Sequence, residues 1–534
     1  MSSSTSDPLR AIFPACSALL AETQWRESLA LLDGEPTADR LAALLAPLAS
    51  NRQLPPYLPE LANLELALYR KRGTTWQPAT VDRLIVNPTF ELLRHSWRGL
   101  AELAGKPRAA PGLSPSPGEE YVMLWRAPAD GRVMLRRAEA AHLLALKMVV
   151  DDADAEEIGR QHEAATGKID AAIAAAVDLG ILLRPQPAIR RDAGLHAGGA
   201  TEAVRQEEFL TAEVFTLQWH ITQACDLHCR HCYDRSSRSQ PSLSRALEII
   251  GQMRRFCRAK HIDGHISFTG GNPLLYPHFF TVYEAAAREN FTLAILGNPV
   301  AATELDRLLA ITRPGFYQLS LEGLEPHNDA IRGPGHFQRV LATLEILRGR
   351  KIYSMIMLTL TRDNLEQVLP LAEVLRDKTD LFTFNRLAAV GEGAALDSAA
   401  PAAYEEFLDR YLAAEATNPV MALKDNLFNI ILHRQGKKPF GGCAGHGCGA
   451  AFNFVSLLPD GEVHACRKFP SPIGNINEQT LAEVYDAEAA ERYRRGSAAC
   501  RSCLIRPVCG GCPAVVHGLG LDPFRDRDPY CFME

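Results

Sequence analysis

The sequence lacks the features that mark several common classes of protein. No uninterrupted apolar run reaches transmembrane length, and the first twenty residues lack the basic start and long apolar core of a secretory signal. The net charge of −6 offers no general attraction for nucleic acid or for an anionic membrane. We therefore expect a cytoplasmic protein that binds neither.

The composition is that of a globular protein with several cores. Hydrophobic residues make up 47% of the 534 residues and charged residues 22%, which is ordinary, and the length allows three or four domains. Stretches rich in proline, glycine and polar residues at 105–118 and 186–210 are predicted linkers. We expect the remaining segments to be a helical domain at 1–104, a second domain at 119–185, a third at 211–395, bridging helices at 396–440 and a cysteine-rich domain at 441–534.

Apolar periodicity predicts helices in the first segment, over Leu9–Leu32, Ala38–Leu48, Tyr57–Tyr69 and Pro88–Leu103. The second segment begins with two strand-like runs, Tyr121–Arg126 and Arg132–Arg136. Three helical patterns follow, over Arg137–Val149, Ala155–Thr166 and Lys168–Leu179. This order resembles a winged helix.

Residues 211–395 alternate short apolar strands with amphipathic helices. The strands are predicted at Val214–Ile221, His265–Phe268, Thr292–Leu296, Gly315–Ser320, Ile352–Thr359 and Leu381–Asn385. The helices between them are predicted at Leu243–Ala259, Pro277–Asn290, Thr303–Ile311, Phe337–Arg348 and Leu365–Lys378. Six such units predict an α/β fold with a parallel sheet, and they are too few to close an eight-stranded barrel, so we expect a partial (β/α)6 TIM-type barrel. Two further helices are predicted at Ala403–Glu415 and Val420–Gln435.

Three cysteines directly after the first of these strands carry the main chemical signal. Cys225, Cys229 and Cys232 have the spacing Cys-x3-Cys-x2-Cys, and Tyr233 follows. Three thiolates can hold three irons of a [4Fe–4S] cluster and leave the fourth iron open for another ligand. The alternatives are a zinc ion with His228 or His231 as the fourth ligand, and three thiols that bind no metal.

The loop after the second strand reads Gly270-Gly271-Asn272-Pro273 and can expose backbone groups to a ligand. Together with the cysteine triad it resembles the radical S-adenosylmethionine (SAM) superfamily. The resemblance implies that the triad ligates a [4Fe–4S] cluster, that the amine and carboxylate of SAM chelate the open iron, and that the glycine loop binds the amine. Asn272 stands where the family has Glu. We expect Gly270, Gly271, Asn272, Pro273 and Tyr233 to contribute to SAM binding.

The fourth strand ends in Ser320-Leu-Glu322-Gly, which also resembles the family. The resemblance assigns Ser320 a contact with SAM, and Glu322 stands where Asp is usual. For Arg386, which ends the sixth strand, a place in the pocket and a surface salt bridge are both open.

Eight cysteines occupy the tail, and taken alone they suit two zinc sites of four thiolates each. Behind a radical SAM core their order resembles the SPASM domain, which carries two auxiliary [4Fe–4S] clusters and would bring the chain to three. If the ligands of the SPASM domain are assigned to this chain by their order in the sequence, the first auxiliary cluster is held by Cys443, Cys448, Cys466 and Cys512. The second is then held by Cys500, Cys503, Cys509 and Cys531. The remaining Cys16 and Cys257 lie in helical patterns and are expected in apolar cores.

The resemblance implies an enzyme that cleaves SAM reductively and uses the 5′-deoxyadenosyl radical on a substrate, with a flavodoxin or ferredoxin as electron donor. In sulfatase-maturing members an Asp base follows the third SPASM cysteine. Arg467 stands there, which argues against formylglycine formation. The sequence does not identify a catalytic residue.

The segment 119–185 resembles the recognition modules of peptide-maturing enzymes, which bind a leader peptide as an added strand. A DNA-binding winged helix is the alternative, but Glu119–Arg184 contains 8 basic and 12 acidic residues, the wrong balance for DNA. We expect oxidative modification of a ribosomally made precursor peptide near Cys, selenocysteine, Ser or Thr, as a thioether crosslink or a thiazole- or oxazole-type ring. The long N-terminal region and the Gly-Gly-Asn-Pro loop are similar to those of thio(seleno)oxazole-type maturases. Action on a protein side chain or small molecule, and a non-catalytic iron–sulfur or zinc scaffold, remain alternatives.

Overall fold

The computed structural model describes residues 7–32, 37–51, 54–77, 80–106, 114–153, 158, 166–191 and 207–533. The chain divides into two compact units, Met1–Gln186 and Pro187–Glu534, each with its own buried core. Within the described part, none of the helices is both long and apolar enough to span a membrane.

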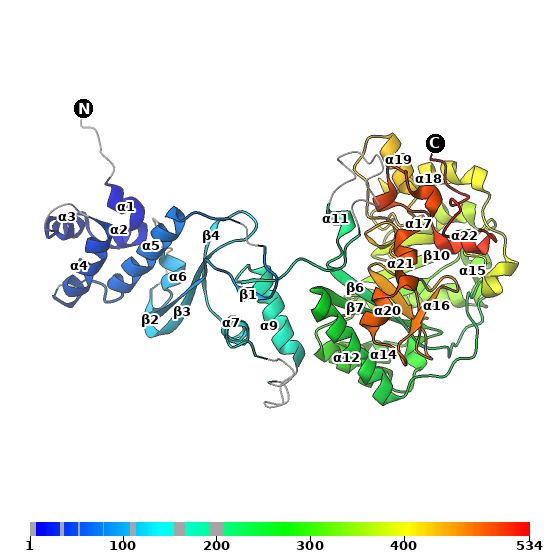
Figure 1. The fold of residues 1–534 in the computed structure, drawn as a ribbon, viewed down its shortest axis with the longest axis horizontal. Coiled ribbons are helices and arrows are strands. Elements are labelled where there is room, and N and C mark those ends of the chain that lie inside the picture. The colour runs from blue at the N-terminus through cyan, green and yellow to red at the C-terminus, as the bar shows by residue number, and fades with distance from the viewer. Residues whose placement is uncertain are drawn as a thin grey trace. The chain divides into compact units, whose positions relative to one another are not determined.

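The first unit packs five helices against a small antiparallel sheet (Figure 1). The helices are α1 (Pro8–Ile12), α2 (Pro14–Leu19), α3 (Glu22–Ala30), α4 (Ala38–Asn51) and α5 (Leu58–Gly73). The sheet has the order β2-β3-β4, formed by β2 (Glu91–Arg98), β3 (Ser116–Arg126) and β4 (Val133–Arg137). The short helix α6 (Leu100–Leu103) follows β2.

A second small cluster completes this unit. The helices α7 (Ala140–Val150) and α9 (Thr166–Asp178) pack together beside an antiparallel pair of two-residue strands, β1 (Ile85–Val86) and β5 (Leu182–Leu183). The strands and two of the three helices expected between 119 and 185 are therefore present. The expected helix at Ala155–Thr166 falls almost wholly outside the described residues, as do 107–113 and 192–206 within the expected linkers.

The helix predicted over Pro88–Leu103 is wrong. Most of that stretch is β2, which pairs with β3 along its length, with a register shift between His95 and Trp97. Leu93 and Trp97 pack against the helical cluster and His95 is 7% exposed, so every second residue faces the core. The period is that of a strand, and its partner β3 stabilises it. Because β3 begins at Ser116, the linker expected at 105–118 ends earlier than predicted.

The second unit is built on one nine-stranded sheet of order β11-β10-β9-β8-β7-β6-β12-β13-β14. Its six parallel strands β6–β11 confirm the predicted partial barrel. They span β6 (Val214–Thr222), β7 (Asp263–Gly270), β8 (Thr292–Leu296), β9 (Phe316–Ser320), β10 (Ser354–Leu360) and β11 (Leu381–Arg386). The helices between them are α12 (Leu243–Lys260), α13 (Phe279–Arg288), α14 (Ala302–Ile311), α15 (Glu325–Arg332), α16 (His336–Gly349) and α17 (Val368–Leu375).

The cysteine-rich tail extends the same sheet. Strand β12 (Phe454–Leu457) pairs in parallel with β6, and the antiparallel strands β13 (Glu462–His464) and β14 (Pro472–Asn475) follow it. The helices of this region are α20 (Leu481–Asp486), α21 (Glu488–Arg495) and α22 (Pro513–Gly518). Tail and barrel therefore share one hydrophobic core, in which Trp219 and Val455 are both fully buried.

The two helices predicted after the barrel are half correct. Helix α18 (Pro401–Glu415) matches the prediction, but only Phe428–Arg434 of the second stretch is helical, as α19. Residues near its start extend the sheet instead, because the N–H of Ala422 donates to the carbonyl of Phe382 in the last barrel strand.

Candidate functional site

The cysteine triad lies on the loop that follows β6, at the carboxyl edge of the sheet. Gly270 and Gly271, at the end of the neighbouring strand β7, lie against this loop. A Cβ on Gly270 would lie 2.1 Å from the carbonyl oxygen of Thr222, and one on Gly271 would lie 2.2 Å from that of Ala224. Only glycine allows this approach, and the N–H of Gly271 donates to Thr222 at 2.9 Å.

One large cavity lies at this edge. It is lined by the triad and by four other residues predicted to bind SAM, which are Tyr233, Gly270, Gly271 and Ser320. Asn272 and Pro273 do not line it. The structure therefore brings seven of the nine predicted residues of this site to one cavity.

Asn272 stabilises the loops instead. Its amide nitrogen donates to Asp226 Oδ1 at 3.1 Å, and its oxygen accepts from the N–H of Leu274. Asn298, on the loop after β8, donates to the same Asp226 oxygen at 2.6 Å and lies 3.5 Å from Cys225 Sγ. Asp226 thus ties the triad loop to the ends of the next two strands. Sequence reasoning missed Asp226 and Asn298, although the place of Asn298 after a predicted strand was a usable signal.

Glu322 and Arg332 form a buried ion pair beneath the triad. Arg332 Nη2 lies 2.6 Å from Glu322 Oε1, and the second carboxylate oxygen accepts from the N–H of Thr359. Burial alone would raise the pKa of Glu322, but His231 and Arg332 nearby hold it well below its usual range. Arg332 also lies 3.7 Å from Cys229 Sγ, so the pair positions the middle cysteine of the triad.

Arg386 lines the cavity, and its ion pairs are buried rather than on the surface. It is 4% exposed at the end of β11, and its guanidinium donates to Asp425 at 2.7 Å and to both oxygens of Asp528 at 2.8 Å. Asp528 in turn accepts from the N–H of Cys512. The arginine joins the last barrel strand to the tail.

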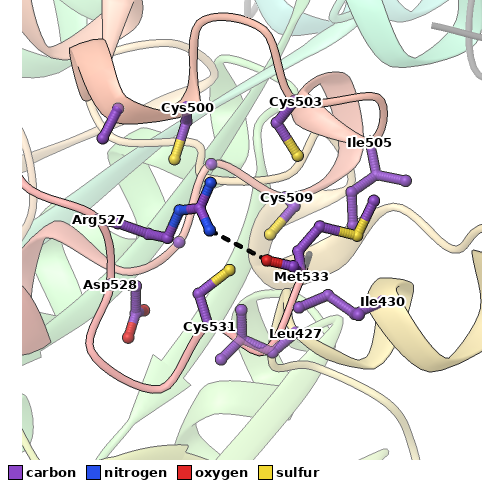
Figure 2. A pocket seen from close by; sticks show the side chains of 13 residues that line it. Leu427, Ile430, Cys500, Cys503, Ile505, Cys509, Arg527, Asp528, Cys531 and Met533 are labelled. Carbon is purple, nitrogen blue, oxygen red and sulfur yellow. Dashed lines mark hydrogen bonds between the residues drawn. The ribbon is translucent and has the colours of Figure 1, made fainter.

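The eight tail cysteines line two further cavities in the groups of four that were expected. Cys443, Cys448, Cys466 and Cys512 line one, and Cys500, Cys503, Cys509 and Cys531 line the other. Figure 2 shows the four sulfur atoms of the second group facing one space, where Arg527 donates to the carbonyl of Met533 at 3.0 Å. None of the thirteen cysteines forms a disulfide bond, and Cys16 and Cys257 are buried in apolar cores as predicted.

The chemistry of these donors fits iron–sulfur clusters. Burial raises the pKa of Cys466 and of Cys500 to about 11 each, and neighbouring cysteines of the same group add to the rise. Four such thiols gain their thiolate form when a metal centre supplies the positive charge. Within the described residues no three His, Cys, Asp or Glu side chains meet as ligands of a single ion.

Comparison with known families agrees with the sequence motifs. Residues 219–375 match the model of the Radical SAM superfamily, and residues 448–504 match the SPASM model, an iron–sulfur cluster-binding domain.

Individual proteins resemble the chain over 59% to 78% of its length. The AdoMet-dependent heme synthase of Methanosarcina barkeri is 27% identical over 59% of this chain and 95% of its own length. The mycofactocin maturase MftC of Mycolicibacterium smegmatis is 28% identical over 59% of this chain and 82% of its own. The crystal structure of Streptococcus suis SuiB bound to precursor peptide SuiA covers 78% of this chain and 95% of its own, with 15% identity and a TM-score of 0.48.

Proposed function

We propose that this chain, a radical SAM enzyme with a C-terminal SPASM domain, modifies a ribosomally made precursor peptide by an oxidative reaction. The mycofactocin maturase, 28% identical, supports a peptide as the substrate. The observation that carries the proposal is the first unit, a separate compact body with a three-stranded sheet that precedes the radical SAM core in the sequence.

This sheet suits a peptide that binds as an added strand. Among the described residues, β2 and β4 each pair only with β3, which leaves one edge of each strand without a sheet partner. A leader peptide that paired there would gain main-chain hydrogen bonds, and side-chain pockets on alternate residues would supply specificity.

In this proposal Cys225, Cys229 and Cys232 hold the SAM-binding [4Fe–4S] cluster, and each cavity of the tail holds one auxiliary cluster with its four cysteines. When bound, these groups supply one-electron chemistry, namely hydrogen-atom removal by a SAM-derived radical and acceptance of an electron from the substrate. Gly270, Gly271, Ser320 and Tyr233 face the bound SAM, whereas Asn272 acts through Asp226. Each of the three cavities is lined by all the cysteines of one group, which supports this assignment of the clusters.

The chain's own residues position the reaction. The Glu322–Arg332 pair and the Asp226 contacts fix the triad loop, and the sheet that barrel and tail share holds the tail beside the same cavity. We propose a thioether crosslink, or a ring of the thiazole or oxazole type near Cys, selenocysteine, Ser or Thr, as the product. The electron donor in this proposal is a flavodoxin or ferredoxin.

The proposal is tested by separating the two units. A variant containing only residues 187–534 retains the shared sheet, so it should bind three clusters, about twelve irons per chain, and cleave SAM. It should fail to bind a precursor leader that the full chain binds in an anaerobic fluorescence-anisotropy titration. Equal affinity of the full chain and the shortened variant for the leader would contradict leader binding by the first unit. Zinc in the tail would contradict the assignment of auxiliary iron–sulfur clusters.

A further inference from the structure

The cavity that contains the cysteine triad is rich in positive charge. Five basic side chains line it against one carboxylate, that of Asp234; the basic residues are Arg235, Arg332, Arg386, Arg467 and Lys468. A positive charge in a partly enclosed cavity costs free energy of desolvation unless an anionic group lies beside it. The five side chains differ in whether the protein supplies such a group.

Three of the five arginines and lysines have carboxylate partners. Arg332 pairs with Glu322 at 2.6 Å, and Arg386 with Asp425 and Asp528. Arg235 lies 3.8 Å from Glu392 and donates to the carbonyl of Cys229. The fourth, Lys468, also lines the neighbouring cavity, together with Asp425 and the four cysteines of the first tail group. Its charge is therefore not confined to the cavity of the triad.

Arg467 is the exception. Its one recorded polar contact is from Nη1 to Thr269 Oγ1 at 3.5 Å, the outer limit of a hydrogen bond. No carboxylate among the described residues forms an ion pair with Arg467, and its side chain is only partly exposed. Unlike Lys468, it does not line the neighbouring cavity. Asp234, the one acidic residue of the cavity wall, already accepts from Ser236 and Gln223.

A second unsatisfied group lies in the same cavity. His220 on β6 is 1% exposed, and its Nε2 has no hydrogen-bond partner within the described structure. Burial, with Arg467 nearby, lowers the pKa of His220 to about 3, so the ring is neutral at pH 7 and can donate one hydrogen bond. A buried ring nitrogen without a partner points to a ligand, and a carboxylate is an acceptor for the tautomer that carries its proton on Nε2.

We propose that Arg467 and His220 bind a carboxylate of the substrate peptide, either its C-terminus or the side chain of an Asp or Glu. A guanidinium donates two parallel hydrogen bonds to a carboxylate, and the partly desolvated cavity strengthens them. Arg467 follows Cys466, so the carboxylate sits between the triad and the first tail group. The inference rests on the proposed function and adds the substrate class to it.

The test uses binding to the reconstituted holoenzyme with SAM and without a reductant. The probes are three pools of random synthetic decapeptides. The first lacks Asp and Glu and ends in an amide, the second lacks them and ends in a free carboxylate, and the third contains them and ends in an amide. Retention of each pool in equilibrium dialysis is quantified by mass spectrometry. The wild type should retain the second or the third pool about tenfold more than the first, and this ratio identifies the source of the carboxylate.

The variant Arg467→Gln should lose this preference. Arg501→Gln is the matched control, because Arg501 also directly follows a tail cysteine but is exposed and lies outside the cavity. Labelled SAM is dialysed in parallel, and its affinity should stay within about twofold. Equal or no retention of the three pools overturns the inference, and so does a tenfold loss of SAM affinity in Arg467→Gln, because the carboxylate would then be that of SAM.

The outcomes of the two proposals can be told apart. Selective retention of a carboxylate pool, with no peptide modified under reducing conditions, would support carboxylate binding by Arg467 and His220 and contradict the proposed function. If an Arg467→Gln variant and the wild type both bind the acid and amide pools alike and still modify a peptide, the proposed function stands and the carboxylate site is contradicted.

Discussion

Arg386 and Asp528 form a bidentate ion pair, with both N–O distances 2.8 Å, between the end of the last barrel strand and the C-terminal segment. Both side chains are almost fully buried. Asp528 also accepts from the N–H of Cys512, and its carbonyl accepts from the N–H of Cys531. One carboxylate residue therefore contacts both groups of tail cysteines and the barrel.

Asp528→Asn should lower the free energy of unfolding of the second unit by about 3 kcal/mol, because it leaves a buried guanidinium with one carboxylate fewer. Anaerobic urea titrations followed by circular dichroism measure the change. Glu366→Gln is the control, because Glu366 pairs with Arg410 on the surface and its removal should cost less than about 1 kcal/mol. Equal effects of the two substitutions would contradict the structural role of the pair.

Gly271→Ala should abolish high-affinity SAM binding, because the added Cβ would lie 2.2 Å from the carbonyl oxygen of Ala224, next to Cys225. Equilibrium dialysis with labelled SAM checks this. Gly349→Ala is the matched control, since a Cβ there meets no atom within 4 Å. Unchanged SAM affinity in the first variant would mean that the glycine loop does not form the site.

Replacing Cys225, Cys229 and Cys232 together by Ala should lower the iron content from about twelve to about eight per chain. The tail groups lie in separate cavities and should stay loaded. Iron and sulfide analysis with electron paramagnetic resonance measures this, and SAM cleavage should stop. A loss of all iron would show that the three groups do not load independently.

Lowering the pH should destabilise the protein through His336. This side chain is 1% exposed and its Nδ1 lies 3.2 Å from the amide of Asn328. Burial, with Arg332 and Arg339 nearby, lowers its pKa from 6.5 to about 4. The unfolded chain therefore takes up the proton first, and stability falls as the pH drops from 6.5 to about 4, by up to about 3 kcal/mol.

Urea titrations at several pH values between 7 and 4, on the wild type and on His336→Asn, isolate this contribution. The asparagine does not titrate, so the variant should lack that part of the pH dependence even if it is less stable throughout. Identical pH profiles for the two proteins would assign the loss to other groups.

The barrel could be predicted from sequence because each of its strands is a short apolar run followed by an amphipathic helix. The strand Thr292–Leu296 was predicted to the residue. The stretch Pro88–Leu103 was not, because its paired apolar residues fit either a helical or a strand period. Its pairing partner β3 begins at Ser116, in a stretch whose proline and glycine predicted a linker. The parallel pairing of β12 with β6 joins segments more than two hundred residues apart, and no local pattern reports it.

Some features of the candidate site could likewise be predicted from the sequence, and others could not. The spacing of Cys225, Cys229 and Cys232 and the glycines beside them were readable, because cluster and backbone chemistry dictate residue type and interval. The partners of Asp226, Arg386 and Arg467 were not, because an ion pair or its absence depends on which loops the fold brings together. Cluster ligation by each cavity stays a prediction.

The most direct test of the proposed function is anaerobic incubation of the reconstituted chain with SAM, a strong reductant and a candidate precursor peptide. Mass spectrometry of the peptide and chromatography of the nucleosides are the readouts. We expect 5′-deoxyadenosine together with a peptide that has lost two hydrogens without added mass. The absence of 5′-deoxyadenosine would contradict the catalytic claim, and its formation with every tested peptide left unchanged would contradict the claim that the substrate is a peptide.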